Sequence, residues 1–376
     1  MAIEPAFPRH DPVGGDDPTV AVDVDSVMAI LGPTAAANDR HGVHRDTIDH
    51  LARAGLLGSP LTPAAAQREL AETIAGCDAT TWFCWVQHQS PLRMLEQATV
   101  TELTPDVEAL QASLLPDLRS GRRLAAVAFA HLRRPGPANP AATRVTGGWR
   151  LVGSLDWVTS WDIADVVMVM AQGTGADADV IVCAYLPAGH SRESTPGVEP
   201  GLPLSLLAMS GTHTRPIVLT DAFVKDAQVV AVIDREEWLA TDAVSSANAN
   251  PAAFGLTRGA VAELDLLARQ REDEKLAAVV DALVDECRSI RRRAYAAIDD
   301  PEVTVADRLE LRAASLDLGV RAATAVVIAR AGAAMRSGHE TERRVREALF
   351  LQVQAQTAAS RAASLDLVLR RATTSS

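Results

Sequence analysis

The run Trp157-x-Thr159-Ser160 combines a flat apolar side chain with two hydroxyl groups at the tip of an expected strand. An indole presents a planar apolar face that can lie against a ring. A neighbouring threonine hydroxyl can donate and accept hydrogen bonds at the polar edge of such a ring. The run therefore predicts a surface for a planar polar molecule. An ordinary hairpin with one buried tryptophan is the alternative, and these residues alone leave it open.

The elements that must position this tip are expected to be strands. Gly148–Asp165 is typical of a strand, a tight turn and a second strand that ends in the Trp157 tip. A third strand is expected to enter Val166–Met170, which is a continuous apolar run.

The chain divides into three parts that differ in hydrophobic periodicity and composition. Residues 20–123 have a helical pattern and are expected to form an N-terminal helical domain, after a disordered tail over residues 1–19. Residues 124–235 alternate short β-branched runs with turn residues, which predicts a middle antiparallel β-domain. Residues 236–376 return to long periodic segments, which predicts a C-terminal four-helix bundle. This order predicts an α+β protein.

Composition limits the class of protein. The chain has 376 residues, of which 48% are hydrophobic and 22% charged, as in globular proteins. Its net charge of −12 argues against nucleic acids and anionic membranes as partners. No apolar stretch is expected to span a membrane. The four cysteines include no Cys-x-x-Cys pair, so we expect reduced, buried thiols in a cytoplasmic protein and no metal site.

Around the Trp157 tip the chain resembles the β-domain of the acyl-CoA dehydrogenase superfamily. That family shows Gly-Tyr-x-Leu-x-Gly-x-Lys-x-Trp-Ile-Thr-Asn/Ser followed by Ala-Asp, and Gly148–Asp165 matches it in one register. The resemblance implies an FAD cofactor, with Trp157, Thr159 and Ser160 beside the isoalloxazine. It also implies N-terminal helices, a middle β-domain and a C-terminal bundle.

Two further segments resemble the family's cofactor contacts. Thr212 and Thr214 fall on the hydroxyl positions of a Gly-x-Arg-x-Ser-x-Thr pattern, in which Ser210 replaces the arginine. A polar turn before a half-buried strand would look the same. The small-residue helix that begins near Gly255 ends at Arg271, where relatives place an arginine that reaches the FAD pyrophosphate, commonly across a subunit interface. The family's following Phe-Gly pair is missing, so a solvated helix-end charge is the alternative for Arg271.

The family's usual catalytic base is absent. Glu342–Thr357 resembles Glu-Arg-x-x-Arg-Asp-Ala-x-x-x-x-Ile-Tyr-Glu-Gly-Thr, and Ala355 stands where many relatives have the glutamate that removes the α-proton. Other branches place the base just ahead of the Gly255 helix. Here Ser245–Pro251 has no carboxylate, and Asp242 lies further back. General-base catalysis needs an ionisable group within hydrogen-bond reach of the proton.

Three histidines are candidates for a site. Ala130 replaces a threonine of the family's first β-strand motif, which brings His131 near the expected flavin, where it could act as an acid or base. An exposed strand-end histidine is the alternative. His339 resembles a histidine of the two-component flavin monooxygenases that share this fold. Those enzymes usually have a second histidine near the position of Gln354, and this chain has none there. His88 lies on a helix that lines the substrate pocket in relatives, but its neighbouring tryptophans are equally typical of a core.

Three functions remain open from the sequence. The first is an FAD-dependent oxidoreductase that acts on the CH–CH group of an acyl thioester, such as acyl-CoA, or of a similar substrate. The second is a two-component monooxygenase that takes reduced FMN or FAD as a co-substrate and needs no α-proton base. The third is a non-catalytic partner subunit. The resemblance implies a homodimer or homotetramer, and the small residues of the bundle would suit close helix packing.

Overall fold

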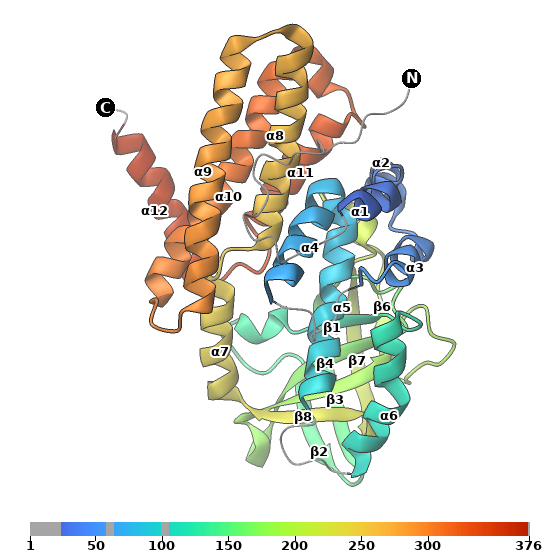
Figure 1. Ribbon diagram of the computed structural model, residues 1–376. Coiled ribbons are helices and arrows are strands. Elements are labelled where there is room, and N and C mark those ends of the chain that lie inside the picture. Colours follow the sequence, from blue (N-terminus) through green and yellow to red (C-terminus); the bar gives the residue numbers. More distant parts are fainter. Residues whose placement is uncertain (1–23, 58–63, 99–104, 375–376) are drawn as a thin grey trace.

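The computed structural model describes residues 24–57, 64–98 and 105–374, so the tail expected over residues 1–19 lies outside the described residues. The chain begins with helices, continues into a sheet and ends in a helical bundle (Figure 1). The first helices are α1 Val24–Leu31, α2 Ala35–His41, α3 Arg45–Arg53, α4 Ala64–Cys77, α5 Ala79–Gln97 and α6 Pro105–Ser120.

The middle part is one eight-stranded sheet with neighbours in the order β6-β7-β3-β2-β4-β5-β8 and with β1 paired to β4. Most pairs are antiparallel, but β1 and β2 each run parallel to β4. The strands are β1 Ala125–Ala128, β2 Ala141–Val145, β3 Gly148–Val158, β4 Val166–Gly173, β5 Val180–Pro187, β6 Val198–Pro200, β7 Arg215–Lys225 and β8 Val229–Asp234.

Strand β4 is buried on both faces. Val167 and Val169 belong to one apolar cluster with β3, β5 and β7. Met168 and Met170 point to the opposite face and belong to a second cluster that includes residues of α5 and α6. Successive strand residues face opposite sides of a sheet, so a continuous apolar run suits a strand that is covered twice.

The prediction of a tight turn inside Gly148–Trp157 is wrong. Strand β3 runs without interruption from Gly148 to Val158. Gly153 has a φ of 138°, and the pairing with β7 shifts register between Leu151 and Gly153. A glycine that leaves ordinary strand geometry is typical of a β-bulge, which bends a strand without ending it.

The helical part begins with α7 Arg235–Ala247, which joins the sheet to the bundle (Figure 1). The bundle helices are α8 Pro251–Arg271, α9 Glu274–Asp299, α10 Val305–Arg330, α11 Glu340–Leu351 and α12 Ala358–Thr374. Side chains of Asn250, Asp273 and Thr304 cap the starts of α8, α9 and α10 by accepting backbone N–H hydrogen bonds.

The small residues of α8 allow α4 to approach closely. A Cβ atom on Gly255 would lie 2.2 Å from the Glu72 carbonyl oxygen, and one on Gly259 would lie 2.8 Å from that of Gly76. The buried Glu72 carboxylate then accepts from Arg258 at 2.8 Å and from Arg291 of α9 at 2.7 Å. These contacts fix the N-terminal helices on the bundle.

Helix α10 differs from one expectation. Within the described ranges, Val305–Met335 is the one helical stretch that is long and apolar enough to cross a membrane by length and composition. No such stretch is expected from the sequence. In the fold α10 packs against α8, α9, α11 and α12, and 33% of its most apolar window is buried inside the molecule.

Candidate functional site

Trp157 is the last residue but one of β3 and is exposed, although Val158 and Thr159 after it are buried. Its side chain is 51% exposed, whereas Trp149 and Trp161 of the same sheet region are 4% and 6% exposed. The ladder with β7 continues past Trp157 to the pair Val158–Arg215, so the backbone beneath the indole is held. The hairpin alternative required a buried tryptophan, and Trp157 is not buried. The indole therefore offers a flat apolar surface at the end of a strand that lies between β7 and β2.

Three buried threonine hydroxyls form a chain beside this tip. Thr159 Oγ1 lies 3.0 Å from Thr214 Oγ1. Thr214 Oγ1 lies 2.8 Å from Thr212 Oγ1. The Thr212 hydroxyl donates to the Met209 carbonyl oxygen at 2.7 Å. The neighbouring Ser160 has a φ of 67°, and its N–H donates to the Thr212 carbonyl, which closes the turn around the chain.

The direction of these hydrogen bonds follows from the number of protons. A hydroxyl has one proton, and a carbonyl oxygen can only accept. Thr212 gives its proton to Met209, so Thr214 must donate to Thr212. Thr159 must then donate to Thr214. The Thr159 hydroxyl oxygen can therefore accept a hydrogen bond from a ligand that binds beside it, but it cannot donate one.

A short 3₁₀ turn, η1 Ala130–Arg133, lies next to the Trp157 tip. His131 Nε2 donates to the Met170 carbonyl oxygen at 2.6 Å, and burial lowers the pKa of its imidazole to about 4. The ring is therefore neutral at neutral pH. Arg134 forms an ion pair with Asp156, the neighbour of Trp157.

The same turn connects the tip to the bundle. Arg133 binds the Asp242 carboxylate of α7 through two hydrogen bonds of 2.8 Å. Both side chains are largely buried, at 14% and 12% exposed. Asp242 is the carboxylate nearest in sequence to the start of α8. Because it is bound to Arg133, it is not available as a base.

The Ala355 position lies in the turn between α11 and α12. It is half-buried and has a φ of 50°, a left-handed conformation that favours glycine. The preceding Gln354 accepts a hydrogen bond from Asn250, the cap of α8, at 3.0 Å. The structure thus brings together the two stretches at which the sequence resemblance places a base, and neither contains a carboxylate.

A buried arginine lies at this junction. Arg312 of α10 donates to the Asn248 carbonyl at 3.0 Å and to the Gln354 carbonyl at 2.8 Å. One turn earlier, Arg308 donates to the Asn248 side chain at 2.8 Å. The sequence analysis missed both residues. Their spacing of four places them on one helix face, but nothing in the sequence distinguishes a buried arginine from an exposed one.

His88 has a different environment from the Trp157 tip. Its Nδ1 accepts from the Ala125 N–H at 3.0 Å, and its Nε2 donates to the Leu118 carbonyl at 3.1 Å. The ring is 1% exposed, and burial lowers its pKa to about 4. Both ring nitrogens are used by the backbone, so the imidazole has none to offer a substrate.

His339 and Arg271 lie at helix ends away from the Ala355 turn. His339 caps the start of α11, where Nδ1 accepts from the Thr341 N–H, and the turn follows the other end of that helix. Arg271 ends α8 and donates to the Ala329 carbonyl at 2.7 Å. Since α8 has 21 residues, its two ends are about 30 Å apart, and one chain does not bring Arg271 to the Trp157 tip.

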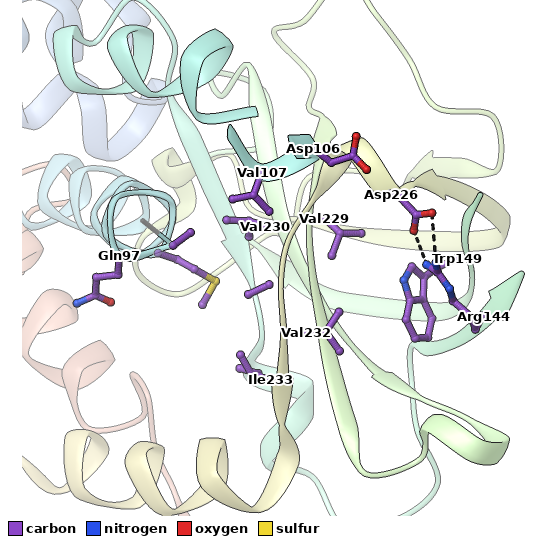
Figure 2. A pocket seen from close by; sticks show the side chains of 13 residues that line it. Gln97, Asp106, Val107, Arg144, Trp149, Asp226, Val229, Val230, Val232 and Ile233 are labelled. Carbon is purple, nitrogen blue, oxygen red and sulfur yellow. Dashed lines mark hydrogen bonds and ion pairs between the residues drawn. The ribbon is translucent and has the colours of Figure 1, made fainter. Parts of the chain in front are cut away.

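A cavity of about 910 Å³ lies on another side of the sheet, between α5, α6 and β8 (Figure 2). Its wall includes Gln97, Asp106, Trp149 and the ion pair between Arg144 and Asp226. None of the site residues expected from the sequence lines it. The cavity is therefore distinct from the Trp157 tip.

No model of a protein family matches the chain, and no curated protein matches it. Solved structures do. The butyryl-CoA dehydrogenase of Megasphaera elsdenii is 18% identical, with a TM-score of 0.73 over 93% of this chain and 99% of that chain. The nitrososynthase of Micromonospora carbonacea var. africana is 19% identical, with a TM-score of 0.74 over 96% and 98% of the two chains.

KijD3, solved in complex with FMN and dTDP-3-amino-2,3,6-trideoxy-4-keto-3-methyl-D-glucose, is 18% identical, with a TM-score of 0.73 over 96% of this chain and 95% of that chain. At these identities the likeness shows the fold. The chain has the acyl-CoA dehydrogenase fold, which confirms the fold class expected from the sequence motifs.

Proposed function

We propose that this protein is a flavin-dependent monooxygenase that takes reduced FMN or FAD as a co-substrate and oxygenates a small molecule. One observation carries the proposal. Ala355 stands at one position of the α-proton base, the other stretch, Ser245–Pro251, contains no carboxylate, and Asp242 is bound to Arg133. Dehydrogenation at a CH–CH bond requires such a base, whereas oxygenation does not.

The Trp157 tip fits a flavin. An exposed indole can cover one face of the isoalloxazine, and Thr159 would lie at its polar edge. Ser160, Thr212 and Thr214 hold Thr159 in place rather than touching the ring. Arg271 would serve only from a second copy of the chain. Bound reduced flavin supplies two electrons and two protons, so that one substrate C–H or N–H and one O₂ give a hydroxylated product, water and oxidised flavin.

The threonine chain favours the reduced cofactor. Atom N5 of an oxidised flavin accepts a hydrogen bond, whereas the N5–H of a reduced flavin donates one. Because Thr159 has given its proton to Thr214, its oxygen can accept but not donate. A ring held against Thr159 is therefore stabilised more in the reduced state.

The test is to purify the protein and to titrate it anaerobically with oxidised and then reduced FMN and FAD. We expect the protein to bind reduced flavin more tightly and to change the time course of its reoxidation when oxygen is added. Acyl-CoAs should not bleach any bound oxidised flavin.

Bleaching by acyl-CoAs would contradict the proposal and favour the dehydrogenase. That second candidate is supported by the Glu342–Thr357 run and by the fold shared with butyryl-CoA dehydrogenase. Failure to bind either redox state of either flavin would instead favour a non-catalytic partner subunit.

A further inference from the structure

Buried arginines of this protein fall into two groups. Arg258, Arg343 and Arg344 each have a carboxylate partner, at 2.8 Å, 2.6 Å and 2.6 Å. Arg308 and Arg312 are equally buried, at 5% exposed each, but neither forms an ion pair with an Asp or Glu of the described residues. Buried charges are normally paired or bind a ligand, because an uncompensated charge is costly inside a protein.

The two arginines differ in how well their donors are used. Arg308 donates from all three of its nitrogens, to the carbonyls of Val303 and Asp300 and to the Asn248 side chain. Arg312 donates to two carbonyls only, and its buried Nε has no partner. Arg312 is therefore the less satisfied of the two cations.

The charged side chains near Arg312 add no net negative charge, because Arg133 and Asp242 neutralise each other. Burial and the nearby charge of Arg133 lower the pKa of its guanidinium to about 10, so it remains charged at neutral pH. The Asp242 carboxylate already forms two bonds with Arg133. The capped N-terminus of α8, which carries the positive end of a 21-residue helix dipole, begins beside Asn248.

We propose that Arg312 binds a carboxylate group of the substrate, beside Ala355 at the junction of α8, α10 and the α11–α12 turn. The inference rests on the proposed function for the identity of the substrate, but the anion site itself does not depend on flavin. Arg312 contacts the turn directly through Gln354, and the methyl group of Ala355 leaves that turn without an acidic side chain.

A carboxylate fits better than a phosphate. The guanidinium of Arg312 is held in place by two backbone carbonyls, and its planar fork of N–H donors matches the two oxygens of a carboxylate. One carboxylate also supplies the single negative charge that Arg312 lacks. The substrate class is thus a small organic acid.

The test measures thermal stability of the flavin-free protein at constant ionic strength. Sodium acetate and sodium succinate are compared with sodium phosphate and sodium chloride. We expect the carboxylates to raise Tm in a saturable way, on the order of 2 °C, with little effect of chloride. Stabilisation by phosphate alone, or none by any anion, would overturn the assignment.

Arg312→Gln removes the charge and should abolish the carboxylate response. Arg361→Gln makes the same change at an exposed position of α12 and should retain it. A carboxylate response that survives in a folded Arg312→Gln protein would refute the role of Arg312.

Ala355→Glu keeps the test decisive even where Arg312→Gln does not fold. A glutamate beside Arg312 should compensate its charge, raise Tm without added anion and remove the response to acetate. Ala359→Glu, at an exposed position of α12, should do neither. An unchanged acetate response in Ala355→Glu would contradict the proposal. Because none of these measurements uses flavin, failure of flavin binding would affect only the proposed function.

Discussion

The proposed flavin site depends most on Trp157, whose indole is half-exposed. We predict that Trp157→Ala weakens binding of reduced flavin by about 1–3 kcal/mol, the range seen when aromatic stacking on nucleobases is removed. Trp157→Phe, which keeps a smaller planar face, should lose less. Fluorescence titration of folded variants measures the difference, and equal affinities for all three proteins would exclude the tip as the flavin platform.

Thr214 sets the proton order of the threonine chain. Thr214→Val has nearly the same shape but removes the acceptor of the Thr159 proton, which is then free to donate to a ligand. We predict that the preference for reduced over oxidised flavin falls by about 2- to 10-fold, the worth of one hydrogen bond. The measurement is the ratio of the two dissociation constants. A ratio that stays constant would show that Thr159 does not face N5.

Sequence patterns located part of the candidate site. The Trp157 tip and the threonines could be predicted because aromatic and hydroxyl residues at strand ends have recognisable spacing. Arg312 could not, because its burial and its lack of an acidic partner among the described residues are features of the three-dimensional structure. The bidentate pair of Arg133 and Asp242 joins residues more than a hundred positions apart, which no local pattern reveals.

At the scale of elements, His88 joins α5 to the end of α6 and the start of β1. Its pKa falls from 6.5 to about 4 on burial, so the unfolded chain binds a proton between these values and the folded chain does not. The contribution of His88 to stability is therefore complete above about pH 6.5 and is lost as the pH falls towards 4, by about 3 kcal/mol, and His131, whose pKa is lowered to about 4 as well, acts in the same direction.

His88→Gln should reduce this pH dependence, leaving the part that comes from His131, and should lower stability at pH 7.5. His190→Gln, at an exposed position, should leave the profile unchanged. Urea unfolding at several pH values measures both effects. An identical pH slope in wild type and His88→Gln would show that the buried histidine is not the source.

Helices and most strands could be predicted from periodicity, but their joints could not. The bulge at Gly153 looks like a turn in sequence because glycine serves both. The approach of α4 to α8 depends on backbone atoms of Glu72 and Gly76 that meet Gly255 and Gly259. Such contacts depend on helix crossing and not on local propensity.

At the scale of the molecule, the surface of α12 predicts self-association. The alanines Ala313, Ala322 and Ala323 pack inside the chain's own bundle. Among the exposed apolar side chains, Leu365, Val368 and Leu369 of α12 share one helix face and are 62%, 64% and 63% exposed. Such a ridge is typical of an interface between copies.

We predict at least a dimer by light scattering at micromolar concentration, and a shift towards the monomer in Leu365→Glu/Leu369→Glu. Leu202→Glu, another exposed leucine, should not change the mass. A wild-type mass near the 39.8 kDa of one chain would exclude the interface and with it any role of Arg271 in a neighbouring site.

The one-way order of the threonine hydroxyls has a consequence for electron flow. If the site holds reduced flavin more tightly than oxidised flavin, a thermodynamic cycle requires the midpoint potential of the bound cofactor to rise, by about 30 mV for each tenfold preference. Dye-equilibration measurements should find that positive shift, and a smaller one in Thr214→Val. The oxidised flavin would then dissociate more readily than the reduced flavin. The protein would then work as one component of a two-component system, in which a separate reductase reduces the flavin and supplies it by diffusion through solution.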